Sequence, residues 1–140
     1  MSDPKIKRVL VSVTDKTGVA DFARALVNEF GAEIISTGGT ARALRAAGVD
    51  CEEVKKVHEG APNVLDRIAA GEIALMINTP FGHATRADGY ELRLEAVKHG
   101  VTHVTNLAGA QAMVAGMEAA RLGGLAAVAL QDLPQWELSR

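Results

Sequence analysis

Residues 9–31 read VLVSVTDKTGVADFARALVNEFG, and this stretch decides the fold. It begins with five aliphatic or small residues, 9–13, which predict a buried strand. Six apolar residues then recur with the spacing of one helical face, and they are Val19, Phe22, Ala23, Leu26, Val27 and Phe30. Gly31 ends that pattern, as glycine commonly does after a helix. The stretch therefore predicts one strand–helix unit of an α/β protein.

The same alternation of short strands and longer helices continues along the chain. Further strands are expected at 33–36, 51–54, 73–78 and 101–105, with a last extended segment at 125–130. Further helices are expected at 41–47, 63–70 and 107–122, and one more is marked by Tyr90, Leu94 and Val97. Between them we expect a turn at 37–40 and polar loops at 55–62 and 79–88. This order predicts a mostly parallel sheet covered by helices on both faces.

The length and composition favour one globular domain, residues 1–140. Hydrophobic residues make up 48% of the chain but aromatic residues only 4%, so the core is expected to consist of Ala, Val, Leu and Ile. The net charge is −2 and no basic stripe is visible, which argues against a nucleic-acid partner. Cys51 is the single cysteine, so an internal disulfide is excluded. With no apolar leader or membrane-length run, we expect a cytoplasmic protein without a membrane partner.

The loop Ser36-Thr37-Gly38-Gly39-Thr40 lies between a predicted strand and a predicted helix. In parallel sheets, ligands bind beyond the carboxyl ends of the strands. Glycines let a backbone approach a ligand, and the free amides of a helix start favour an anion. The alternative is a plain glycine turn in which Thr40 caps the helix, and the spacing alone leaves both open.

Two lysines follow other strands and could supply charge to the same anion. Lys16 lies in the turn 12–18, where a solvated lysine is the simpler interpretation when it is taken alone. Lys56 lies in the loop 55–60 together with His58 and Glu59. An imidazole can titrate near neutral pH, although a surface histidine is the simpler interpretation of His58. No activated nucleophile accompanies it.

Asn78 and Thr79 follow the clearest central strand. An asparagine here can bind a base edge or a hydroxyl, or it can simply shape the turn at Pro80. Arg86 and Asp88 form either a lid over a ligand or a surface ion pair, of which the pair is favoured. The four histidines show no metal-ligand spacing, and the dinucleotide and Walker glycine motifs are absent. We therefore expect no metal and no cofactor.

Several motifs together resemble the carboxyl-terminal regulatory domain of the carbamoyl-phosphate synthase large chain. They lie at 56–60 (KVHEG), 62–63, 65–66, 71–73, 77–80 (INTP), 86–91 (RADGYE), 105–110 (TNLAGA) and 130–133. The segments 12–18 (SVTDKTG) and 35–41 (ISTGGTA) instead resemble the start of inosine monophosphate cyclohydrolase. Both belong to the methylglyoxal-synthase-like superfamily, so the resemblance covers nearly the whole chain at that level.

The resemblance implies a Rossmann-like three-layer fold, with a parallel sheet of about five strands between helices and a phosphate site in these loops. Its implied ligand is a phosphorylated small molecule, a nucleoside monophosphate such as uridine or inosine monophosphate. The implied ligand contacts are Lys16, Thr37, Gly39, Thr40, Lys56, Asn78 and Thr79, and Ser12, Gly38 and Arg86 complete the predicted site. The implied partners are carbamoyl-phosphate synthase subunits or a second copy of the chain.

The function predicted from this resemblance is nucleotide binding by a regulatory domain, and two enzymatic alternatives stay open. For a cyclohydrolase, the only candidates for proton transfer within reach are His58 and Lys56. The Lys-Thr-Leu-His-Pro and Asp-Ile-Gly-Gly-Pro runs of that family are absent here. For methylglyoxal synthase, the position of the catalytic aspartate falls near Ala61, and Asp66 is displaced onto the next helix, where it is expected to face solvent.

Overall fold

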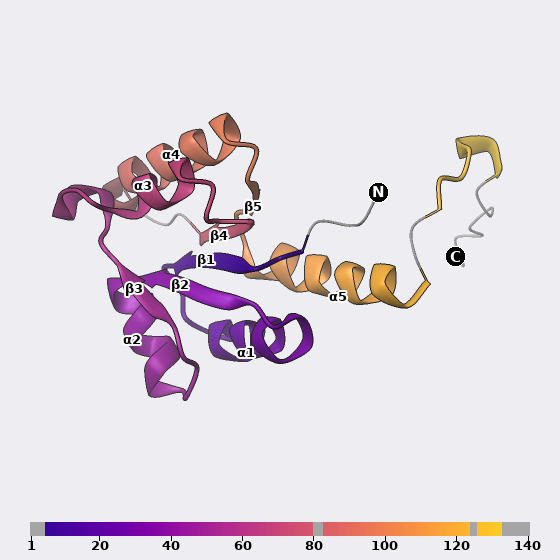
Figure 1. Ribbon diagram of the computed structural model, residues 1–140, viewed down its shortest axis with the longest axis horizontal. Coiled ribbons are helices and arrows are strands. Elements are labelled where there is room, and N and C mark those ends of the chain that lie inside the picture. The colour runs from indigo at the N-terminus through magenta and orange to yellow at the C-terminus, as the bar shows by residue number, and fades with distance from the viewer. Residues whose placement is uncertain (1–4, 80–82, 124–125, 133–140) are drawn as a thin grey trace.

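Five parallel strands form one sheet, in the order β3-β2-β1-β4-β5 (Figure 1). The computed structural model describes residues 5–79, 83–123 and 126–132, with only the backbone of 83–86. The strands are β1 (Arg8–Val13), β2 (Glu33–Thr37), β3 (Glu52–Val54), β4 (Leu75–Thr79) and β5 (Thr102–Val104). The central strand β1 pairs with β2 on one side and with β4 on the other. The predicted α/β fold with a parallel sheet of about five strands is therefore confirmed.

Helices cover both faces of this sheet. They are α1 (Val19–Phe30), α2 (Gly38–Ala46), α3 (Val64–Ala69), α4 (His83–Lys98) and α5 (Leu107–Gly123), with short 3-10 turns η1 (Val57–Glu59) and η2 (Leu130–Asp132). In Figure 1, α3 and α4 lie on one side of the strands, while α1, α2 and α5 lie on the other. Among these described helices, none is long and apolar enough to cross a membrane.

The two faces of the sheet have separate hydrophobic cores, because alternate residues of a strand point to opposite sides. Val9, Val11 and Val13 of β1 pack with α1 and α5, and Leu44 of α2 joins that core. Leu10 packs on the other side with α3 and α4. The core is mainly aliphatic, as the low aromatic content predicts, although Phe22 of α1 is also buried in it. Because β1 pairs with both β2 and β4, the carboxyl ends of these three strands lie side by side.

Two expected loops are wrong in part. The turn expected at 37–40 is already the first turn of α2, which begins at Gly38. The polar segment expected to be a loop as far as Asp88 is helical from His83 onward. Polarity favoured a loop here, but a helix that covers a sheet needs only one apolar stripe. In the segment expected to be extended, residues 126–129 are irregular and Leu130–Asp132 is a 3-10 turn, while Leu125 lies outside the described residues.

The face of α4 also differs from expectation. Tyr90, Leu94 and Val97, which marked this helix in the sequence, are 63%, 42% and 65% exposed. The buried stripe is formed by Leu92 and Ala96, which pack against β4 and α3. Both stripes have helical spacing, so periodicity alone cannot say which one faces the sheet.

Arg67 of α3 links this helix to β3 and to the segment before β4. Its guanidinium donates to Glu52 of β3 and to Glu72, which precedes β4. These hydrogen bonds hold the pKa of Glu52 below its usual range, so the ion pair stabilises the fold at neutral pH. Because the folded-state pKa is depressed, this stability is present above about pH 4.3, the ordinary value for Glu, and is lost as the pH falls through the folded value.

We expect Arg67→Met to lower the free energy of unfolding at pH 7 by about 0.5–1 kcal/mol, since the pair is partly exposed to solvent. The difference from the parent protein should shrink as the pH falls below 4. Urea denaturation at pH 7 and at pH 3.5 measures both quantities. Lys55→Met removes an exposed cation and should lower stability at neither pH. An Arg67→Met effect that is independent of pH would contradict the assignment.

Candidate functional site

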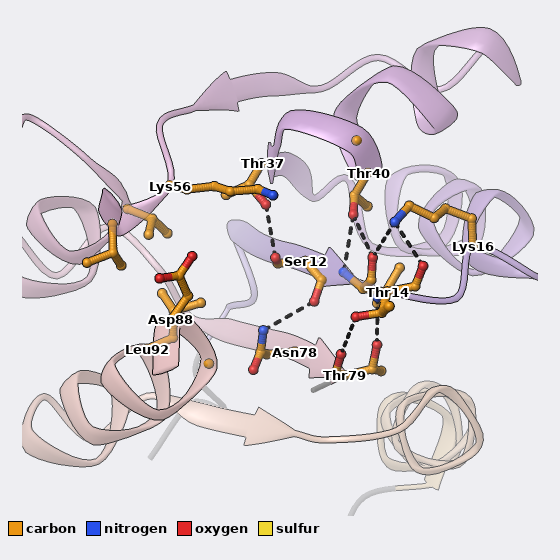
Figure 2. Close-up of a pocket in the computed structure, with 15 residues that line it drawn as sticks. Ser12, Thr14, Lys16, Thr37, Thr40, Lys56, Asn78, Thr79, Asp88 and Leu92 are labelled. Atoms are coloured by element: carbon orange, nitrogen blue, oxygen red, sulfur yellow. Dashed lines mark hydrogen bonds between the residues drawn. The ribbon is translucent and has the colours of Figure 1, made fainter. Parts of the chain in front are cut away.

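A cavity of about 150 Å³ opens where β1, β2 and β4 end (Figure 2). Its polar lining is Ser12, Thr14, Lys16, Thr37, Thr40, Lys56, Asn78, Thr79 and Asp88, and its other lining is Val13, Gly39, Val57, Val64, Gly89 and Leu92. The residues come from loops that are far apart in the sequence. The cavity therefore lies at the edge of the sheet where parallel strands bind ligands.

The start of α2 forms one wall of the cavity. Thr37 is the residue before the helix, and its side chain makes no capping hydrogen bond. Gly38 has a φ of 25°, a conformation that favours glycine, and Gly39 lines the cavity without a side chain. The helix dipole and the amides at this end favour a negatively charged group.

Both lysines predicted from the sequence flank this wall. A Cβ atom at Gly39 would lie 3.9 Å from Lys16 Nζ, and one at Gly38 would lie 3.6 Å from Lys56 Cε. Figure 2 shows the two side chains reaching the same end of β1 from opposite sides. Two positive charges therefore stand beside the amides that open α2.

Lys16 is held in place by its own loop. Its ammonium donates to the carbonyls of Val13 and Thr14, at 2.8 and 2.9 Å, which leaves one of its three N–H donors for another group. Asp15 orders the same loop by accepting from the amide of Thr17, and this bond lowers the pKa of Asp15. The loop thus presents Lys16 in one geometry.

Lys56 is positioned by hydrogen bonds of its backbone to Glu59. Its backbone N–H donates to Glu59 Oε2 at 2.7 Å, and the amide of Glu59 donates back to the Lys56 carbonyl at 3.1 Å. This closes the short turn η1 and fixes the point from which the Lys56 side chain leaves the chain.

Hydroxyl groups connect the end of β1 to the end of β2 and to the start of α2. Thr40 Oγ1 accepts from the Val13 amide at 3.2 Å and donates to the Val13 carbonyl at 3.0 Å. The hydroxyls of Ser12 and Thr37 are 2.9 Å apart. Thr40 is therefore not the N-terminal cap of α2, which was one interpretation of the sequence. It lines the cavity while its hydroxyl fastens α2 to β1.

On the β4 side, the predicted residues are joined by two that the sequence did not single out. Asn78 donates to the Ser12 carbonyl at 3.3 Å and accepts from Arg93 at 3.1 Å. Thr79 Oγ1 accepts from the Thr14 amide at 3.0 Å. Thr14 follows β1 directly, so its place in the loop was a usable signal. Arg93 had none, because only the facing of α4 brings it to Asn78.

Asp88 lines the cavity from α4, and His58 approaches it from η1. His58 Nδ1 lies 2.7 Å from Asp88 Oδ2. The expected pairing of Asp88 with Arg86 cannot be compared, because the Arg86 side chain lies outside the described residues. His58 is exposed, as expected of a surface histidine, and is not among the lining residues. Asp66 faces solvent as predicted, and its carboxylate accepts from the Asn63 amide at the start of α3.

The structure brings most of the predicted site residues to one place. Eight line the cavity, namely Ser12, Lys16, Thr37, Gly39, Thr40, Lys56, Asn78 and Thr79. Gly38 is adjacent to them but is not a lining residue. The apolar residues Val57, Val64 and Leu92 were not predicted, since aliphatic residues of a core and of a pocket wall look alike in a sequence. Within residues 5–79, 83–123 and 126–132, no cluster of His, Cys, Asp and Glu side chains could hold a metal ion.

The sequence of this chain is similar to those of known proteins. Residues 18–105 match the family model of the MGS-like domain. The chain is 41% identical over 126 residues to the carbamoyl phosphate synthase large chain, C-terminal section, of Methanopyrus kandleri. It is 42% identical over 127 residues to the carbamoyl phosphate synthase large chain of Methanothermobacter thermautotrophicus. Each match covers 89% of this chain, but only 23% and 12% of those proteins.

A solved structure, the crystal structure of ForH, shares the fold. It superposes with a TM-score of 0.60 at 20% sequence identity, covering 85% of this chain and 81% of that one. At this identity the likeness concerns the fold alone.

Proposed function

We propose, from the premise that this chain belongs to the MGS-like domain family, that it is a regulatory domain of the carbamoyl phosphate synthase large-chain type. Its ligand is a phosphorylated metabolite, a nucleoside monophosphate, bound in the cavity at the ends of β1, β2 and β4. Residues 1–140 act as one binding domain in this proposal. Catalysis belongs to other parts of such a synthase.

One observation carries the proposal. Lys16 and Lys56, from two different loops, flank the amides that open α2 within a single cavity. A phosphate dianion would there meet two ammonium groups and the positive end of a helix dipole. If each lysine were simply a solvated turn residue, there would be no reason for both side chains to lie beside the same helix start.

The rest of the cavity suits the remainder of a nucleotide. Hydroxyls of Ser12, Thr14 and Thr79 can contact sugar oxygens. The aliphatic side chains of Val57, Val64 and Leu92 offer an apolar surface to a flat ring. A cavity volume of about 150 Å³ is small for a whole nucleotide, so the base is expected to extend toward the opening.

The partners in this proposal follow from the relatives. Because the chain spans only 12–23% of the large chains that it matches, the remainder of such a synthase is the natural partner. The domain would sense the nucleotide and transmit its presence across that contact.

Isothermal titration tests the proposal with uridine and inosine monophosphates, other nucleotides and sugar phosphates. We expect saturable binding of at least one nucleoside monophosphate, and weaker binding of its unphosphorylated nucleoside. The absence of binding across the whole panel would contradict the proposal. Two enzymatic assays accompany it, one for turnover of dihydroxyacetone phosphate and one for purine ring closure, and both should stay at background.

A further inference from the structure

Asp88 adds a carboxylate to a cavity that we propose binds an anion. It is the one acidic side chain among the residues that line the cavity in the described part of the chain. Salt screens exposed charges over about 8 Å at physiological ionic strength, and it screens partly buried charges much less. An ionised Asp88 carboxylate would therefore repel a bound dianion with little screening.

His58 is placed to cancel that charge. Its Nδ1 lies 2.7 Å from Asp88 Oδ2, although 30 residues separate the two in the sequence. The side chain of His58 is 61% exposed, and that of Asp88 is 30% exposed. The imidazole can therefore exchange protons with solvent while it contacts a carboxylate in the cavity wall. When His58 is protonated, the pair is neutral, and when it is not, Asp88 keeps its full negative charge.

We propose that His58 is a proton-dependent regulator of this cavity: its protonation neutralises Asp88, so a dianion binds together with a proton. This inference rests on the proposed function, since it concerns the same cavity. His58 acts through Asp88 and does not touch the ligand. Affinity for a dianion is therefore higher when His58 carries a proton than when it does not.

The other charged groups around the pair do not account for a change of affinity near neutral pH. Lys16 and Lys56 line the same cavity and carry the ammonium groups that attract the anion. The Glu59 carboxylate accepts from the Lys56 amide on the same turn as His58. Among protein side chains, histidine is the one whose charge ordinarily changes between pH 5 and 8. The change between pH 5.5 and 8 is therefore assigned to the imidazole.

Sulfate is the suitable probe, because it stays a dianion over this whole pH range, whereas a phosphate monoester titrates near pH 6. Its dissociation constant can be followed by the amide chemical shifts of Gly38, Gly39 and Thr40 at constant low ionic strength. We expect affinity to fall by about twofold to tenfold between pH 5.5 and pH 8.

Four variants separate charge compensation from a merely structural brace. His58→Asn should bind sulfate at pH 5.5 as weakly as the parent does at pH 8. Asp88→Asn should bind as tightly at pH 8 as the parent does at pH 5.5. The double variant should resemble Asp88→Asn, because the uncompensated carboxylate is gone. His99→Asn is the matched control, since His99 also pairs with a carboxylate on α4, Glu95, away from the cavity. It should keep the parent's pH dependence.

Two results would overturn the inference while leaving the proposed function intact. One is sulfate binding that does not change with pH in the parent protein. The other is a double variant that binds as weakly as His58→Asn, which would make the pair a structural brace. If sulfate leaves the amides of residues 38–40 unperturbed at every pH, the anion cavity itself is wrong, and the proposed function fails together with this inference.

Discussion

Lys56→Ala is expected to weaken nucleoside monophosphate binding by about tenfold to more than a hundredfold, and Lys16→Ala by a similar factor. Each substitution removes a charge-assisted contact to the phosphate, worth about 1.5–3 kcal/mol. The geometry behind the prediction is the placement of both side chains within 4 Å of the Cβ positions of Gly38 and Gly39. Isothermal titration with the tightest ligand of the panel measures the loss.

Lys55→Ala serves as the control, because it removes a neighbouring charge that does not line the cavity. It should leave affinity within about twofold, since exposed charges act weakly through water. Lys56→Arg keeps the positive charge and should therefore retain more of the binding than Lys56→Ala does. Unchanged affinity in both Lys56→Ala and Lys16→Ala would mean that the ligand binds elsewhere. Thermal unfolding of each variant distinguishes lost binding from lost structure.

Thr40→Val is expected to lower the free energy of unfolding by about 1–3 kcal/mol. Valine has nearly the shape of threonine, so the packing of the start of α2 is preserved. The Val13 amide, however, loses its acceptor, and the Val13 carbonyl loses one of its two donors and keeps only the Lys16 ammonium. Thr40 is only 3% exposed, so water cannot easily replace either bond. Urea denaturation of the two proteins measures the difference.

Thr40→Ser is the matched variant for this test. It keeps the hydroxyl and loses only a methyl group, so its cost should be clearly smaller, near 0.8 kcal/mol. If Thr40→Val is as stable as the parent, the two hydrogen bonds contribute nothing to the fold. If Thr40→Ser is the less stable of the two, the methyl group matters more than the hydroxyl.

Local sequence accounts well for elements that have one apolar face and a clear end. Helix α1 runs from Val19 to Phe30, as its spacing predicts, and Gly31 after it has the left-handed conformation of a helix end. A helix is also expected from residue 63, and α3 does follow Asn63, whose side chain accepts from the Leu65 amide. In both cases the signal lies within a few residues of the feature that it predicts.

Local sequence failed where two interpretations satisfied the same pattern. In α4, two stripes have helical spacing, and only the position of the sheet selects Leu92 and Ala96 rather than Tyr90, Leu94 and Val97. Thr40 suited an N-terminal cap equally well, but the end of β1 lies close enough to capture its hydroxyl. Each choice depends on a segment that is distant in the sequence.

The sequence by itself determined the alternating order of strands and helices, the glycine-rich start of α2 and the residue types that could meet a phosphate. It did so because periodicity and turn chemistry are properties of neighbouring residues. Only the tertiary structure decided that Lys16 and Lys56 converge on one helix start, and that His58 meets Asp88. Those residues lie 30 to 40 positions apart, and such distances are closed by the pairing of β1 with β2 and β4 and by the packing of α4 on the sheet.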